Sequence, residues 1–218
     1  MDKMTRNSLE SLIAFHCAPA LAGIKAANLF TLRHVQAQPT DGGLEAARTR
    51  LAAFDISMET LCRCERHALI LVYREDLLRG AFTPEAETFL EGYGYPAGSS
   101  VAEKLSYLKS RLSSYGEFPH EIGVFLDYPL ADVKGFIENR GGAYKACGLW
   151  KVYGDKDGTL ALFERYKRCT EYFCKKLEAG WGMTQLLASP AAFESASDGF
   201  ARAPHRGGFC RSASAYAA

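Results

Sequence analysis

Ala68-Leu-Ile-Leu-Val-Tyr73 is an uninterrupted apolar run. It follows residues 56–63, in which Ile56, Met58, Thr60 and Cys62 alternate with the intervening side chains at the two-residue period of a strand. A continuously apolar strand belongs in the middle of a sheet, because both of its faces are buried there. We therefore predict a β-hairpin over residues 56–74, with 68–73 as a central strand.

In the rest of the chain, the spacing of apolar residues and the positions of Gly and Pro predict an α+β fold. The small mixed or antiparallel sheet contains the hairpin and a strand at 149–153, and helices cover it. A helix near the N-terminus breaks at residues 15–19, and Pro19 starts a new one, because proline suits the first helical position. The other elements expected are a strand at 27–32 and helices at about 44–54, 84–91, 100–113, 119–126, 130–139 and 160–177.

Composition divides the chain at about Gly180. Residues 1–180 are expected to form a single globular α+β domain. Residues 181–218 are rich in Ala, Ser and Gly with scattered aromatic side chains, a low-complexity composition typical of disorder. We expect a mostly disordered tail with one docking segment.

Charge and cysteine content limit the classes of partner. The 218 residues carry 26 Lys and Arg against 25 Asp and Glu, a net charge of +1, which does not favour binding of nucleic acid. The sequence has no apolar stretch long enough to cross a membrane, so no membrane association is expected. Seven cysteines at irregular positions predict free thiols and a cytoplasmic location. The oligomeric state stays open.

Three stretches carry a family resemblance: 15–30 with His16-Cys-Ala-Pro19, 118–136 with Phe118-Pro-His-Glu-Ile-Gly123, and 147–155. They resemble, in motif order over roughly residues 8–178, the bacterial domain of unknown function thirty-seven ninety-three. The resemblance implies a soluble protein typical of anaerobic bacteria and assigns no catalytic role. Two positions depart from the family pattern: Asp127 stands in place of Gly, and Ala146 stands in place of a second Cys before Cys147.

His16-Cys17 is the first candidate for chemistry. A thiol just ahead of a helix begun by Pro19 would face unpaired backbone N–H groups, which lower a thiol pKa and make it a nucleophile or metal ligand. The alternative is that Cys17 is a small buried hydrophobe and His16 a hydrogen-bonded linker residue.

His120 is the second candidate, as a metal ligand or acid–base group, against a purely structural histidine. Glu121 is explained as a first-turn residue that favours the helix dipole. Val124, four residues after His120, rules out the paired histidines of a zinc protease. The mixed charges of residues 130–140 do not favour DNA recognition by a 119–139 helix pair.

Lys25, Trp150 and Tyr153 are the candidate cofactor-binding residues. Trp150 and Tyr153 lie on opposite faces of one short strand, so an exposed face beside Cys147 could hold a flat ligand. The alternatives are that both aromatic side chains fill the core and that the tip of Lys25 simply reaches solvent.

The leading functional prediction is a metal- or cofactor-binding accessory protein of anaerobic redox or iron metabolism, where the anaerobic context comes from the resemblance alone. Its metal ligands would be Cys17, His120 and Cys147, and a metal, haem or flavin is the expected cofactor. One alternative is a thiol-dependent transferase or hydrolase with Cys17 as nucleophile and His16 or His120 as base. Another is a non-catalytic module that binds a protein partner through residues 119–139 and the tail.

Overall fold

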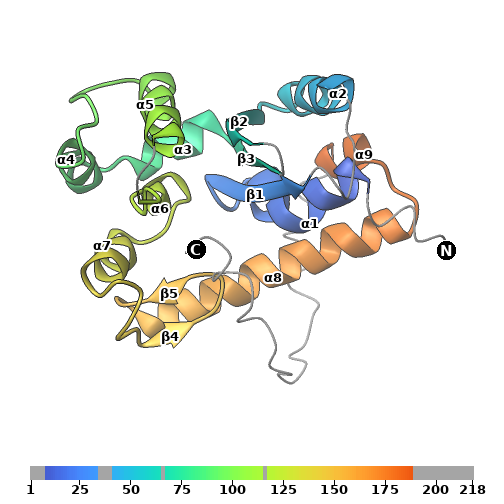
Figure 1. Cartoon of the computed structure of the whole chain (residues 1–218). Helices are drawn as coiled ribbons and strands as arrows, with labels where there is room; N and C mark the ends of the chain where they lie inside the picture. Colours follow the sequence, from blue (N-terminus) through green and yellow to red (C-terminus); the bar gives the residue numbers. More distant parts are fainter. Residues whose placement is uncertain (1–7, 34–40, 65–66, 115–116, 189–218) are drawn as a thin grey trace.

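The fold is taken from a computed structural model of the chain, which describes residues 8–33, 41–64, 67–114 and 117–188 (Figure 1). Helices and two small antiparallel sheets alternate along the described chain, which confirms the α+β class. In chain order the elements are α1 (Leu9–Leu21), β1 (Ala27–Arg33), α2 (Asp41–Ala52), β2 (Ser57–Arg63), β3 (His67–Tyr73), α3 (Glu75–Ala81), α4 (Pro84–Glu91), α5 (Val101–Ser113), α6 (Ile122–Phe125), α7 (Leu130–Glu138), β4 (Ala146–Cys147), β5 (Lys151–Val152), α8 (Lys156–Glu178) and α9 (Met183–Leu187).

The larger sheet has the strand order β1-β3-β2, with both pairings antiparallel. The predicted hairpin is present as β2 and β3, and β3 is central, as its continuous apolar sequence indicates. Tyr73 at the end of β3 is flanked by Ala27 on β1 and Ser57 on β2. The strand expected at 27–32 is therefore the third member of this sheet.

Two apolar cores lie on opposite faces of this sheet. Along β3, Ile70 packs into the core shared with α1, α2, α8 and α9, whereas Leu71 packs into the core shared with α3, α4, α5 and α6. Neither side chain is accessible to solvent. Burial on both faces explains why β3 is continuously apolar from Ala68 to Tyr73.

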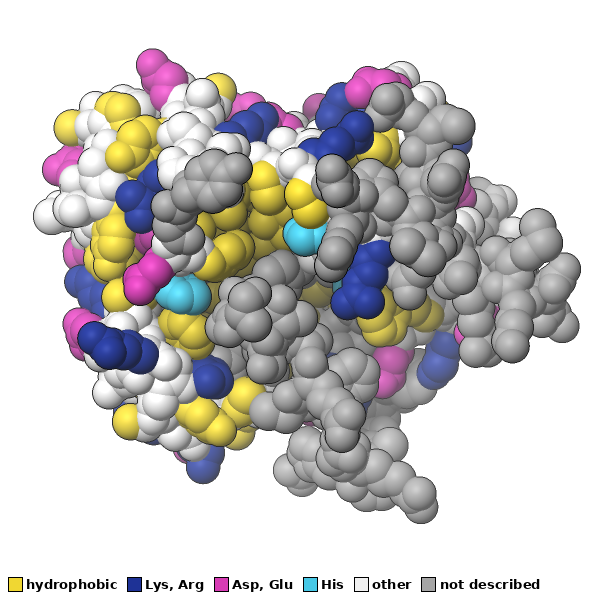
Figure 2. All heavy atoms as spheres, in the orientation of Figure 1, with side chains coloured by type: hydrophobic (Ala, Val, Ile, Leu, Met, Phe, Trp, Pro, Cys, Tyr) yellow, Lys and Arg dark blue, Asp and Glu magenta, His cyan; other side chains and the backbone are white. Residues whose placement is uncertain are grey.

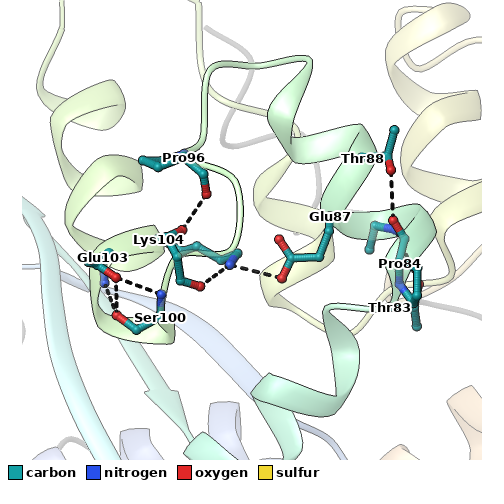
Figure 3. Close-up of polar contacts among 10 residues, drawn as sticks. Thr83, Pro84, Glu87, Thr88, Pro96, Ser100, Glu103 and Lys104 are labelled. Carbon is teal, nitrogen blue, oxygen red and sulfur yellow. Dashed lines mark hydrogen bonds and ion pairs between the residues drawn. The ribbon is translucent and has the colours of Figure 1, made fainter.

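A buried ion pair joins α4 to α5 (Figure 3). Lys104 on α5 is 1% exposed, and its Nζ lies 3.0 Å from Oε1 of Glu87 and also donates to the carbonyl oxygen of Ser99. The same helix begins with a capping box between Ser100 and Glu103. Lys104 is thus a buried lysine whose ammonium group has two polar partners in the fold.

The second sheet, β4–β5, is a separate two-stranded hairpin. It lies at the N-terminal end of the long helix α8, which runs beneath the larger sheet toward α9 (Figure 1). Trp150 and Val152 pack there against Phe163 and Tyr166 of α8 in a third apolar cluster. The prediction that strand 149–153 belongs to the main sheet is therefore wrong, because β5 is only two residues long and pairs with β4 alone.

Four elements also differ from the sequence predictions. Pro19 lies inside α1 and does not start a helix, and α3 was not predicted. Only residues 122–125 of the expected helix 119–126 are helical. Beyond Gly180, α9 buries Leu186 and packs on the core, so the folded domain extends past the predicted boundary.

Residues 189–218, the rest of the predicted tail, lie outside the described residues. Within the described part of the chain, no helix combines the length and apolarity needed to cross a bilayer.

Candidate functional site

The loop between α1 and β1 places a lysine inside the protein. Lys25 is 5% exposed, and its Nζ lies over three aromatic rings, with distances to the centroids of 4.9 Å for Tyr128, 5.7 Å for Tyr166 and 6.0 Å for Trp150. These three rings come from the α6–α7 turn, α8 and the β4–β5 connection. Together with Asp127 they form what we term the Lys25 cluster: Lys25, Asp127, Tyr128, Trp150 and Tyr166.

The aromatic rings of the cluster pack against one another and against Phe163. Tyr128 stacks on Trp150 with centroids 4.3 Å apart, and Phe163 meets Trp150 edge to face at 4.4 Å. Phe163 can approach because a Cβ on Gly148 would come within 2.3 Å of its ring. Glycine at this position therefore permits the packing that holds Trp150.

Asp132 on α7 fixes the position of Trp150. The Asp132 side chain is 2% exposed, and its Oδ2 accepts a hydrogen bond of 2.8 Å from the indole Nε1 of Trp150. Its Oδ1 accepts bonds of 2.7 Å from the backbone N–H groups of both Tyr153 and Gly154. One buried carboxylate therefore ties α7 to the segment on both sides of β5, and each of its oxygens is used.

Asp127 follows α6 with a φ of 58°, in the left-handed region that favours glycine. Its Oδ2 accepts a hydrogen bond of 3.2 Å from the backbone N–H of Ala26, which holds the Lys25 loop against the α6–α7 turn. The positive φ gives a physical reason to expect glycine at this position. In this chain the position instead adds a carboxylate beside Lys25.

The surroundings of Lys25 favour the neutral amine. Burial lowers its pKa from an ordinary 10.5 to about 8, and the negative charge of Asp127 offsets part of that effect. Burial also raises the pKa of Tyr166, and Asp127 acts in the same direction, so this phenol stays protonated. The cluster thus combines an amine whose pKa is lowered, a carboxylate and three aromatic faces.

Lys25 differs from the other deeply buried lysine, Lys104. Nζ of Lys104 is bound by Glu87 and the carbonyl oxygen of Ser99. Among the residues that the structure describes, Nζ of Lys25 has neither a hydrogen bond nor an ion pair, and three aromatic faces lie against it. Contact with these ring faces stabilises the charged form of the amine.

Cys17 lies in the interior of α1 and is completely buried. The helix continues through Pro19, so no helix N-terminus faces the thiol, and the predicted lowering of its pKa is wrong. Burial raises the pKa of Cys17 strongly, and the charge of Lys25 opposes this only in part. An inert apolar thiol is the form that this environment supports.

His16 and His120 are placed among aromatic side chains. His16 stacks on Phe30 at 5.8 Å, and His120 meets Phe136 at 4.9 Å. Burial lowers the pKa of both imidazoles. Figure 2 shows histidine side chains at the margin of a surface on which hydrophobic side chains gather. Both histidines are therefore held chiefly as neutral aromatic rings.

Glu121 is not a residue of an exposed first helical turn. Its side chain is 1% exposed, and Oε1 forms an ion pair of 2.6 Å with Nε of Arg111 and accepts a hydrogen bond of 3.2 Å from the hydroxyl of Tyr95. The explanation of Glu121 by the helix dipole is wrong, because this carboxylate instead joins α5 to the segment that precedes α6.

The proposed metal ligands do not form a metal-binding group. Within residues 8–33, 41–64, 67–114 and 117–188, no three His, Cys, Asp or Glu side chains gather in a way that could hold an ion. Cys17 lies in α1, His120 before α6 and Cys147 in β4. The structure does not unite these three residues as metal ligands.

Of the predicted cofactor-binding residues, Lys25 and Trp150 meet in the cluster. Tyr153 does not line it: its ring packs against Gly135, where a Cβ would come within 2.4 Å, and its hydroxyl donates to the carbonyl oxygen of Gly142 at 2.8 Å. The sequence prediction missed Tyr128 and Tyr166. Tyr128 lies within the second resemblance stretch, which was the available signal.

The three stretches that carry the family resemblance converge here. Lys25 comes from the first, Asp127, Tyr128 and Asp132 from the second, and Trp150 from the third. Residues 13–187 match the model of a family described as "Protein of unknown function (DUF3793)". Comparison with curated proteins and with solved structures gives no significant match.

Proposed function

This chain belongs to the family of proteins of unknown function DUF3793, and from that premise we propose that it is an accessory protein that binds a flat, conjugated small molecule at the Lys25 cluster. The observation that carries the proposal is the buried amine of Lys25, which has aromatic faces but no hydrogen-bond acceptor among the described residues. A ligand that supplies an acceptor would give Nζ a hydrogen bond that the described residues do not provide.

The aromatic rings indicate the class of ligand. Tyr128 and Trp150 are already stacked with an interplanar angle of 23°, so a planar ring could extend or replace this stack. Asp132 holds the indole by Nε1 and so fixes the plane against which a ring that replaces Tyr128 would stack. These features favour an organic cofactor over a metal ion.

The cellular setting is part of the proposal. The cysteines in the described part of the chain are all free, which supports a reducing compartment such as the cytoplasm. The resemblance implies a protein of anaerobic bacteria, where a role in redox or iron metabolism would bring it into contact with flavin or haem.

Tryptophan fluorescence tests the proposal directly. The sequence contains two tryptophans, and replacing Trp181 by Phe leaves Trp150 as the sole reporter. Titration of this variant, purified without oxygen, with flavin mononucleotide, haem or pyridoxal is expected to quench Trp150 saturably for one of them. Adding Lys25→Met should weaken that binding at least tenfold, because the ligand loses its contact with Nζ.

A matched control uses Lys167, which is exposed on α8 next to Tyr166 in sequence. Lys167→Met should bind as tightly as the parent. Absence of saturable quenching with all three probes, or equal binding by the Lys25→Met and Lys167→Met variants, would reject the site.

A further inference from the structure

We infer that Lys25 captures a carbonyl compound covalently, as an imine between Nζ and the carbon of an aldehyde or ketone. The inference rests on the proposed function and makes it specific, because it names the reactive group of the ligand. It is carried by the position of Nζ among three aromatic rings beside one carboxylate.

Nζ of Lys25 lacks the hydrogen-bond acceptors that the fold gives to its other buried lysine. A buried structural lysine needs acceptors, and Lys104 shows how this fold provides them with Glu87 and Ser99. No described residue provides one for Nζ of Lys25. No described residue donates a hydrogen bond to Nζ either, so the lone pair of the neutral amine is available for attack on a carbonyl carbon, as a nucleophilic amine requires.

The lowered pKa of Lys25 suits imine formation. An imine-forming lysine must be partly neutral near physiological pH, and burial in apolar surroundings is an established way to achieve this. The pKa of about 8 for Lys25 leaves a substantial neutral fraction there. An ordinary exposed lysine, with a pKa of about 10.4, holds less than about one amine in a thousand in that form at neutral pH.

Imine formation between Nζ and a carbonyl carbon balances without an oxidant or reductant. The neutral Nζ adds to the carbonyl carbon and forms a carbinolamine. Loss of one water molecule, which carries away the carbonyl oxygen, leaves the C=N bond. Water carries the proton that Nζ releases to the departing hydroxyl group, and the negative charge of Asp127 favours the positively charged intermediate.

The aromatic cluster also suits the product. The C=N bond conjugated to an aromatic ring is planar and could stack against Tyr128 and Trp150, whose rings are nearly parallel. A protonated imine would keep the positive charge over the same ring faces that now contact Nζ.

The experiment uses two probes that differ only in the carbonyl group: salicylaldehyde and the corresponding 2-hydroxybenzyl alcohol. The full-length protein is incubated with the aldehyde, the imine is reduced with borohydride to a stable secondary amine, and the modified lysine is identified by peptide mass spectrometry. We expect modification of Lys25 to be at least tenfold faster than that of Lys167.

Lys25→Met should lose this modification, while Lys167→Met should keep it at Lys25. Mapping in the unaltered protein keeps the test valid even if a variant folds poorly. Modification spread evenly over exposed lysines, with Lys25 unmodified, would overturn the inference.

The alcohol separates the two proposals. Quenching of Trp150 by the alcohol, without adduct formation by the aldehyde, would leave the binding site in place and reject the covalent step. Failure of both probes to bind would reject both.

Discussion

Asp132 accepts a hydrogen bond from the indole Nε1 of Trp150 at 2.8 Å, and both side chains are buried. The second carboxylate oxygen of Asp132 accepts from the backbone N–H groups of Tyr153 and Gly154. The ring that lies beside Lys25 is thus held by a residue that does not itself contact the amine. Asp132 is a positioning residue for the cluster.

Replacing Asp132 by Asn should destabilise the protein by about 2–3 kcal/mol, because one of the acceptor oxygens becomes an N–H donor that faces another donor. Equilibrium unfolding in urea measures this, with Trp150 fluorescence in the Trp181→Phe background as the probe. Asp157→Asn, at an exposed position in α8, is the control and should cost less than about 1 kcal/mol. Equal stability of the two variants would contradict the role given to Asp132.

Lys25→Met should change how stability depends on pH. The folded-state pKa of Lys25, about 8, is below its ordinary value of 10.5, so the unfolded chain binds more protons between these values. The free energy of unfolding of the parent therefore gains a contribution that grows as pH rises from about 8 to 10.5, on the order of 3 kcal/mol in total.

The Lys25→Met variant lacks this contribution and should be the more stable protein at neutral pH, with the difference shrinking as pH rises. The comparison must be made between the two proteins, because buried tyrosines and cysteines such as Tyr166 and Cys169 have raised pKa values and lower the stability of both at alkaline pH. A stability difference that stays constant over this range would refute the prediction.

Asp127→Asn should lower the pKa of Lys25 below about 8, since the side chain keeps an acceptor for the N–H of Ala26 but loses its charge. Asp127→Gly should lower this pKa similarly and relieve the positive φ, at the loss of that hydrogen bond. The two effects on stability oppose each other and should nearly cancel, to within about 1 kcal/mol. NMR titration of isotopically labelled lysine measures the pKa; identical titration of Lys25 in all three proteins would be inconsistent with this electrostatic coupling.

Glu121→Gln should cost about 2–3 kcal/mol, because it leaves the guanidinium of Arg111 without its buried counter-charge. Tyr95→Phe, which removes only the hydroxyl that donates to Glu121, should cost about 1 kcal/mol. Thermal unfolding of the two variants compares these losses. A cost below about 0.5 kcal/mol for Glu121→Gln would instead agree with a weak interaction at an exposed helix end.

The periodicity of apolar residues correctly predicted the elements in which buried and exposed positions follow a regular pattern. The central strand 68–73 and the helices at 84–91 and 100–113 match β3, α4 and α5 closely, because each has a clear apolar period or cap signal. Pro19 was misleading, since α1 buries nearly all of its second half and tertiary packing maintains the helix through the proline.

The candidate site could be predicted only in part. Lys25 and Trp150 were predicted from their neighbours in the sequence, and they lie close together in the structure. Tyr166, in contrast, is indistinguishable in the sequence from the other apolar positions of a long helix. Its distance from Lys25 along the chain hides the contact. The interpretation of Cys17 failed because it depended on a helix boundary, the feature that local sequence defines least well.

The hydrogen bond from the backbone of Ala26 to Asp127 joins residues 101 positions apart, and Tyr166 lies further still along the chain. Contacts of such long range are entropically costly to close and form late during folding. The Lys25 cluster is therefore assembled only when nearly the whole domain has been synthesised and packed. A ligand of this cluster would therefore bind only the completely folded protein, and neither nascent nor proteolysed chains would bind it.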